Sequence, residues 1–286
     1  MEEAILLFFE EIRSPALDWV FGILSLMGEA VLIAGAVLLL YWLLDGRTGE
    51  QLLLTATSSA AFNCMLKASV LRPRPYMAGV VSLHPDTPLF SSQGLGDNLS
   101  FPSGHAQATS SALFAGALRL RGAVWRTLGW ALSAILTLLV CCSRLYFGVH
   151  YPSDLFAGVL LGLLFALFWQ LIFAAAYRFR YYILLALAVA ALCVLPFSPS
   201  TDFIRTAGMV VGCAIFLPLS TLLKYDAPKQ LRRRFLRIPV GLFCTGAVFA
   251  GSCFFPEGHG FLLLQWLLLA GAATFLATLC FKVLKI

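Results

Sequence analysis

Long apolar segments separated by short polar connections dominate the chain. Several apolar runs reach about 18 residues or more, which is typical of helices that cross a bilayer and too long for the strands of a barrel. The pattern predicts nine such helices, at about residues 22–44, 50–70, 103–120, 125–145, 153–176, 181–197, 203–222, 238–254 and 260–281. The segment before them predicts a short amphipathic helix at the membrane interface, with its apolar side chains against acyl chains: Leu6, Leu7, Phe8 and Phe9.

Composition supports this interpretation. The 286 residues are 60% hydrophobic and only 12% charged, whereas soluble domains carry about 25% charged residues. We therefore expect an all-α, polytopic integral membrane protein. The eight cysteines lie in or beside apolar runs without a C-x-x-C pair, so they predict buried thiols, with neither a disulfide nor a zinc site.

The net charge of +6 is distributed as a membrane topology signal, and it does not indicate a nucleic-acid partner. One set of alternate connections holds most of the basic residues: Arg47, Arg119, Arg121, Arg126, Arg178, Arg180, Lys224, Lys229, Arg232, Arg233, Arg234, Arg237, Lys282 and Lys285. Positive charge concentrates in cytoplasmic loops, so the N-terminus is predicted outside and the C-terminus inside. The other set holds Arg13 and Arg205, together with a group that topology does not explain and that predicts an anion site: Lys67, Arg72, Arg74 and Arg144.

Three polar motifs fall on that same predicted outer face. KASVLRPRP places Lys67 and Arg74 with six residues between them, FPSGHA opens one helix at Ser103, and SRLYFGVHYPSD joins two helices. Arginine offers a planar fork of donors to phosphate oxygens and lysine a point charge. The N–H groups and dipole at a helix start also favour an anion. The sequence therefore predicts a phosphate site, and the motifs bring no carboxylate cluster suited to Mg²⁺.

Two histidines supply candidate chemistry. His150 and Asp154 are four residues apart across a helix start at Pro152. Asp154 can accept a hydrogen bond from one ring N–H of His150, which fixes the tautomer and leaves the other nitrogen free to attack phosphorus. His105 lies at the start of the phosphate-binding helix and suits the role of general acid.

Together the motifs K-x6-R-P, P-S-G-H and S-R-x5-H-x3-D resemble the three signatures of the type 2 phosphatidic acid phosphatase superfamily. All signature positions are present: Lys67, Arg74, Pro75, Pro102, Ser103, Gly104, His105, Ser143, Arg144, His150 and Asp154. The resemblance covers about residues 20–175 and implies a six-helix core, so that 1–178 forms the phosphatase core and 179–286 a C-terminal bundle of about four additional spans.

This resemblance also implies a two-step, metal-independent and cofactor-free mechanism. His150 would form a phosphohistidine, Asp154 would orient it, and His105 would protonate the leaving group and then activate water. The phosphoryl oxygens would be held by Lys67, Arg74, Ser103, Gly104 and Arg144.

The expected function is a lipid phosphatase of the bacterial cytoplasmic membrane with its site on the outer face. Undecaprenyl diphosphate, phosphatidylglycerol phosphate, phosphatidic acid and a sphingoid-base phosphate all fit as substrates. Two alternatives stay open: a sugar-phosphate phosphatase, suggested by a layout like that of glucose-6-phosphatase, and a lipid phosphotransferase. A non-catalytic lipid transporter or binder is a further alternative, but it commonly lacks a catalytic histidine. The sequence does not determine the oligomeric state.

Some polar positions have two interpretations. Arg72 either binds the head group or caps a helix end, and Glu29 lies either within the membrane or at its outer interface. His84, His259 and Asn63 have no signature role, and the histidines are expected to be structural or on the surface. The run QLRRRFLRI is either a topology signal or a site for anionic head groups. Three aromatic residues either pack around the site or form an interfacial belt: Tyr146, Phe147 and Tyr151.

Overall fold

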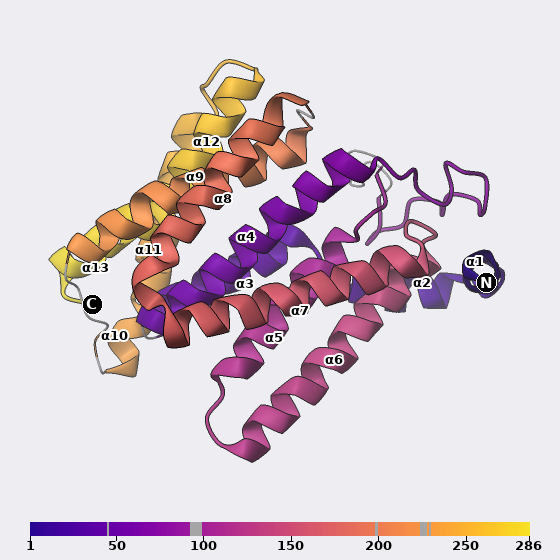
Figure 1. The fold of residues 1–286 in the computed structure, drawn as a ribbon, viewed down its shortest axis with the longest axis horizontal. Helices are drawn as coiled ribbons and strands as arrows, with labels where there is room; N and C mark the ends of the chain where they lie inside the picture. The colour runs from indigo at the N-terminus through magenta and orange to yellow at the C-terminus, as the bar shows by residue number, and fades with distance from the viewer. Residues whose placement is uncertain (45, 92–98, 198–199, 224–227, 229) are drawn as a thin grey trace. The chain divides into compact units, whose positions relative to one another are not determined.

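The computed structural model describes residues 1–44, 46–91, 99–197, 200–223, 228 and 230–286. Across these residues the secondary structure is helical, and the extended pairing is confined to two isolated bridges, Pro73–Leu99 and Thr87–Phe90. The predicted all-α class is therefore confirmed (Figure 1). Lys224 and Lys229 of the predicted topology signal lie outside the described residues.

The chain folds into two compact units, one formed by residues 1–35 and 62–168 and the other by 36–61 and 169–286. The first unit contains α1 (Glu2–Glu11), α2 (Pro15–Met27), α5 (Gly104–Arg119), α6 (Ala123–Tyr146) and most of α7 (Pro152–Ala175). α3 (Ala30–Leu43) and α4 (Gly46–Val70) each have residues in both units. The second unit contains α8 (Arg180–Val194), α9 (Thr201–Leu222), α10 (Leu231–Phe235), α11 (Arg237–Ser252), α12 (His259–Gly271) and α13 (Ala277–Leu284), with the short turns η2 (Tyr177–Phe179), η3 (Leu195–Phe197) and η4 (Ala272–Leu276). The predicted functional boundary between 178 and 179 stays a prediction.

Each of the nine predicted spans corresponds to helical segments, but α4 (predicted as 50–70) and α5 (predicted as 103–120) are not among the described helices that are long and apolar enough to cross a membrane. The segment predicted as a single helix over 22–44 is a pair, α2 and α3, bent by 45°. Among the described residues, six helices are long and apolar enough to cross a membrane by themselves, and the bent pair would make seven. Four of them follow residue 176: Tyr177–Phe197, Thr201–Leu222, Leu231–Ser252 and His259–Leu284. The chain is thus a multi-pass membrane protein, while the number of C-terminal spans stays a prediction.

Glycines bring α5 and α7 into close contact within the first unit. A Cβ on Gly158 would lie 2.6 Å from the carbonyl oxygen of Ser103, and one on Gly162 would lie 2.6 Å from that of Gln107. This four-residue spacing of small side chains lets two helix backbones approach closely, as is common in membranes. The contact aligns the starts of the two helices that carry the second and third motifs.

The N-terminal helix α1 packs on protein more than the sequence predicts. Leu6 is buried against Val81 and Tyr151, and Phe9 packs against an aromatic cluster that includes Phe147. Leu7 and Phe8 remain exposed, as expected for residues facing lipid. The expectation for Leu6 and Phe9 is wrong because positions three apart share one helix face, and this face covers the loop that follows α6.

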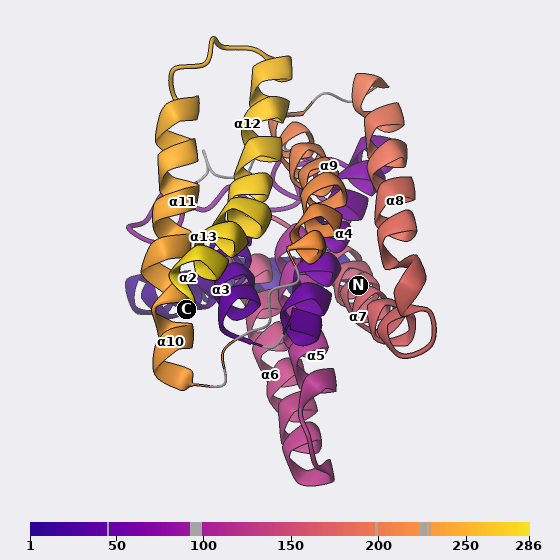
Figure 2. The same ribbon diagram turned by 90° about the vertical axis from the view of Figure 1, so that its left-hand side faces the viewer.

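In the second unit, α9 lies beside α8 and α12, and α11 packs against α12 and α13 (Figure 2). Its α4 segment carries the buried Glu50, which accepts hydrogen bonds from Arg180 at 2.8 Å and from the Tyr177 hydroxyl at 3.1 Å. A buried carboxylate needs such partners. The hydrogen bonds from Arg180 and Tyr177 therefore account for the burial of Glu50.

Candidate active site

The start of α5 forms one wall of the site. Ser103 caps the helix, with its hydroxyl accepting from the Ala106 amide at 3.5 Å and its carbonyl from the Gln107 amide at 3.0 Å. The amides of Gly104 and His105 precede these at the open helix end, which is an arrangement suited to an anion. The Ser103 amide donates to the carbonyl of Asp154 at 3.0 Å, so α5 and α7 are joined at their starts.

Asn63 supports this wall from α4. Its side-chain amide donates to Gln107 Oε1 at 2.8 Å and to the Pro102 carbonyl at 3.4 Å. The buried Asn63 therefore fixes the turn that precedes α5 and has a structural role.

The first motif delivers two cations through a helix end and a paired loop. Lys67 lies in the last turn of α4, and its Nζ donates to the Leu99 carbonyl at 2.9 Å. The Ser100 amide donates to the Arg72 carbonyl at 2.8 Å, which holds the two ends of the long loop together. Arg74 follows on this loop and is buried, with Nη1 donating to the Val149 carbonyl at 3.0 Å.

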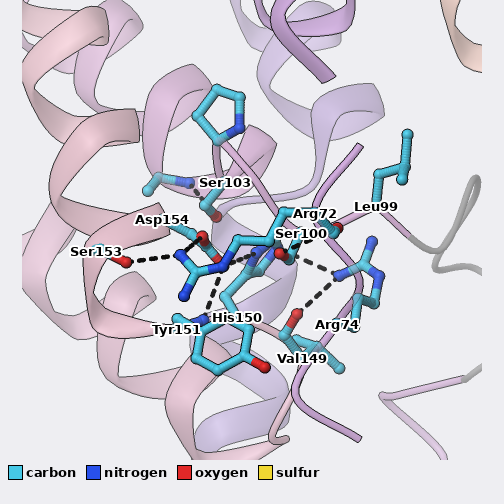
Figure 3. Close-up of polar contacts among 12 residues, drawn as sticks. Arg72, Arg74, Leu99, Ser100, Ser103, Val149, His150, Tyr151, Ser153 and Asp154 are labelled. Carbon is cyan, nitrogen blue, oxygen red and sulfur yellow. Dashed lines mark hydrogen bonds and ion pairs between the residues drawn. The ribbon is translucent and has the colours of Figure 1, made fainter. Parts of the chain in front are cut away.

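His150 lies between Arg74 and Asp154 (Figure 3). Its Nε2 is 3.4 Å from Arg74 Nη1, and its Nδ1 is 3.6 Å from Asp154 Oδ2. The imidazole and the carboxylate are 2% and 0% exposed. The ring is thus placed with one nitrogen beside a carboxylate and the other beside a guanidinium.

Arg72 holds the same carboxylate from its other oxygen. Its Nη1 donates to Asp154 Oδ1 at 2.8 Å and to the Ser153 hydroxyl at 2.7 Å, and its guanidinium lies 3.9 Å from the centre of the Tyr151 ring (Figure 3). Arg72 thus holds the orienting carboxylate, a role that neither interpretation from the sequence included. In the sequence, Arg72 stood out as one of the basic residues on the predicted outer face that topology does not explain. The spacing of the motifs did not indicate its contact with Asp154.

Arg144, near the end of α6, completes the cationic group. It is 3% exposed, and its Nη1 lies 2.5 Å from the Ser25 hydroxyl of α2. Its Nε has no hydrogen-bond partner among the described residues. A buried guanidinium of this kind retains donor capacity for an anion.

The electrostatics favour a neutral His150. Burial lowers the pKa of this imidazole well below its ordinary value, and the positive charges of Arg74, Lys67 and Arg144 lower it further. An uncharged imidazole keeps a lone pair available for attack.

His105 is held by a residue from outside the three motifs. Its Nε2 lies 3.3 Å from Glu29 Oε1, in the bend between α2 and α3. All eight predicted site residues lie within the first unit, where Arg72 contacts Asp154 and Glu29 contacts His105. No group of three His, Cys, Asp or Glu side chains suited to a metal ion occurs in the described part of the chain.

The two other histidines do not join the site. His84 is buried, with Nε2 3.0 Å from Asp18 Oδ1 and its ring packed against Phe90 and Phe147. His259 is exposed at the start of α12. Tyr146, Phe147 and Tyr151 are buried in aromatic and apolar clusters of the first unit.

Comparison with known proteins agrees with the motifs. Residues 49–178 match the model of the PAP2 superfamily. A decaprenylphosphoryl-5-phosphoribose phosphatase of Mycobacterium tuberculosis is 36% identical over 102 residues, which are 36% of this chain and 48% of that protein. An undecaprenyl-diphosphatase of Sulfolobus acidocaldarius is 46% identical over 63 residues, which are 22% of this chain and 28% of that protein. This chain thus spans less than half the length of these curated relatives.

Among solved structures, the chain is similar to a transmembrane PAP2 type phosphatidylglycerolphosphate phosphatase from Bacillus subtilis. The sequence identity is 25% and the TM-score 0.48, with 63% of this chain and 87% of that chain covered.

Proposed function

We propose that this protein is a membrane phosphatase that hydrolyses a lipid phosphomonoester or diphosphate through a phosphohistidine on His150. The observation that carries the proposal is the buried His150, whose two ring nitrogens lie beside Asp154 and Arg74. A nucleophile whose orientation is set by a carboxylate and that faces a guanidinium is arranged for attack on a phosphoryl group.

In the first step, Nε2 of His150 attacks phosphorus and the bond to the leaving oxygen breaks. Asp154 accepts the Nδ1–H of His150, which fixes the tautomer and stabilises the cationic ring. The 3.6 Å separation of Nδ1 and Oδ2 shortens to a hydrogen bond as charge develops on the ring, since such contacts are often long before substrate binds.

His105 completes the proton transfers. It donates a proton to the leaving oxygen in the first step. In the second step it accepts a proton from the water that attacks phosphorus, and the bond to His150 breaks to release inorganic phosphate. Lys67, Arg74, Arg144 and the amides at the start of α5 bind the phosphoryl oxygens throughout, and their positive charge stabilises the transition state. No metal ion or cofactor takes part in the proposed cycle.

The proposed location is the outer face of a bacterial cytoplasmic membrane, with the N-terminus outside and the C-terminus in the cytoplasm. The distribution of Lys and Arg along the connections supports this orientation. A site at that interface meets phosphorylated head groups directly. Reporter enzymes fused to the C-terminus test this orientation. A reporter that is active only in the cytoplasm should be active in the fusion, and activity of a reporter that works only in the periplasm would contradict the proposed orientation.

We further propose a polyprenyl phosphate or diphosphate as the preferred substrate. Both curated relatives are named for polyprenyl-linked phosphates. Phosphatidylglycerol phosphate, phosphatidic acid and a sphingoid-base phosphate are the competing lipids.

A substrate panel in detergent tests the function. Polyprenyl diphosphate, the monoester lipids and a sugar phosphate are compared by phosphate release, with His150→Ala as the control for contaminating activity. Preference for a lipid by at least tenfold in kcat/KM is expected, and preference for the sugar phosphate contradicts a lipid phosphatase. Transfer of phosphate to an added lipid alcohol instead of water indicates a phosphotransferase. Inhibition by EDTA contradicts the metal-independent mechanism.

A further inference from the structure

The bend between α2 and α3 contacts two residues of the proposed site. The two helices meet at 45° around Gly28 and Glu29. These residues precede the segment 49–178 that matches the superfamily. The bend therefore adds contacts that the three motifs do not contain.

Glu29 contacts the proposed general acid directly. Its Oε1 lies 3.3 Å from Nε2 of His105, and its side chain is 44% exposed whereas that of His105 is 19% exposed. A carboxylate at one ring nitrogen of a histidine fixes the tautomer and stabilises the protonated ring.

Gly28 keeps the bend close to the imidazole. A Cβ at this position would lie 2.6 Å from Val140 Cγ1 and 3.1 Å from His105 Cδ2. A larger residue at this position would have to displace Val140 or move the bend away from α5 and α6.

Ser25 lies one turn before Glu29 and makes the second contact. Its hydroxyl is 2.5 Å from Nη1 of Arg144. The same short segment thus fixes a proposed phosphate ligand on α6 and the proposed acid on α5.

We propose that Glu29 is a positioning residue for His105 and that the α2–α3 bend is a structural part of the active site. This inference rests on the proposed function. Glu29 accepts the Nε2–H of His105 and leaves Nδ1 to carry the proton that the leaving oxygen receives. In the second half of the cycle, Nδ1 accepts the proton of the attacking water, and Glu29 again stabilises the imidazolium.

Other charged groups also act on His105. Arg144 acts from α6 and Arg74 from the loop after α4, whereas the nearby imidazole of His150, in the connection between α6 and α7, is neutral. Glu29 is the carboxylate that opposes these groups at the ring. Removal of the Glu29 charge therefore destabilises the protonated form of His105, so that His105 loses its proton at a lower pH.

The test compares Glu29→Gln with Glu29→Asp, and uses Glu11→Gln as a matched control because Glu11 is an exposed carboxylate of α1. Activity is measured as kcat/KM on an alkyl lipid phosphate and on p-nitrophenyl phosphate, across pH. An alkyl oxide needs a proton to leave, whereas nitrophenolate does not.

For Glu29→Gln we expect kcat/KM on the alkyl phosphate to fall about tenfold or more, with a much smaller fall on the aryl phosphate. The alkaline limb of the pH profile should move to lower pH, and Glu29→Asp should recover most of the activity. An equal loss on both substrates with an unmoved limb contradicts a role through His105, and so does a variant that matches Glu11→Gln. The proposed function has separate outcomes, because activity that survives in His150→Ala, or a preference for the sugar phosphate, contradicts it whatever Glu29 does.

Discussion

Arg72 and Asp154 form an ion pair of 2.8 Å next to the proposed nucleophile, His150. The other oxygen of Asp154 accepts from the Tyr151 amide at 2.8 Å and lies 3.6 Å from Nδ1 of His150. Glu2 of α1 extends the chain of contacts, because it pairs with Arg72 at 3.2 Å and accepts from the Ser153 amide at 2.8 Å. Both oxygens of the orienting carboxylate are thereby fixed before substrate arrives.

We predict that Arg72→Gln lowers kcat about tenfold or more while KM changes little. Arg72 contacts the carboxylate that orients His150, and its guanidinium donates to Ser153, Asp154 and Glu2, which are not proposed phosphate ligands. Arg72→Lys should restore the activity only in part, since an ammonium cannot reproduce the planar fork shared by Ser153, Asp154 and Glu2.

The matched control for Arg72 is Arg126→Gln, an exposed position near the start of α6. Steady-state kcat and KM are measured for Arg72→Gln, Arg72→Lys and Arg126→Gln. A rise in KM with an unchanged kcat assigns Arg72 to substrate binding and contradicts its role in holding Asp154.

We predict that Gly158→Ala destabilises the protein and reduces its activity. The added methyl group would lie 2.6 Å from the Ser103 carbonyl, and such overpacking costs about 1–3 kcal/mol. Gly116→Ala on α5 is the control, because a Cβ there meets nothing within 4 Å. Thermal unfolding in detergent and phosphate release are measured together, and equal Tm values for the two variants contradict the close packing of α5 and α7.

The pH at which activity is lost on the acid side of the pH profile should depend on the positive charges around His150. Its pKa is lowered well below the ordinary value, first by burial and then by Arg74, Lys67 and Arg144. Attack requires the neutral ring, so activity is present above this lowered pKa and is lost as the pH falls through it. Wild-type kcat/KM should therefore persist below about pH 6.5, the ordinary pKa of histidine.

Lys67→Gln removes one of these charges and should move the acid limb to higher pH by roughly half a unit or more. Comparing variant and wild type on the same substrate cancels the ionisation of the phosphate itself. An acid limb that stays fixed, or that moves to lower pH, contradicts the electrostatic account of His150.

The spacing of residues within the three motifs was sufficient to predict most of the candidate site residues from the sequence. Lys67, Arg74, His105, His150 and Asp154 lie at motif positions, and their roles depend on short-range geometry at helix ends. The contacts of Arg72 and Glu29 depend on which loop meets which helix, and a single sequence does not give that information. The sequence also shows a glycine followed by a glutamate inside an apolar run, but it does not give the 45° angle between α2 and α3.

Hydropathy predicted where the helices lie along the chain, but it did not predict which face of each helix is buried. Leu6 and Phe8 are equally apolar, yet one is buried and the other exposed. Gly158 and Gly162 show the small-residue spacing typical of close helix pairs, and their partner on α5 became evident only in the structure.

Trapping of the covalent intermediate tests the central claim most directly. His105→Ala lacks the proposed base of the second step, and an aryl phosphate needs no acid in the first, so the phosphorylated enzyme should accumulate. We expect a label from ³²P-aryl phosphate that is stable to alkali and labile to acid, that maps to His150 by mass spectrometry, and that disappears in the His105→Ala, His150→Ala double variant. A label on another residue, or phosphate release by His150→Ala at the wild-type rate, would contradict the account.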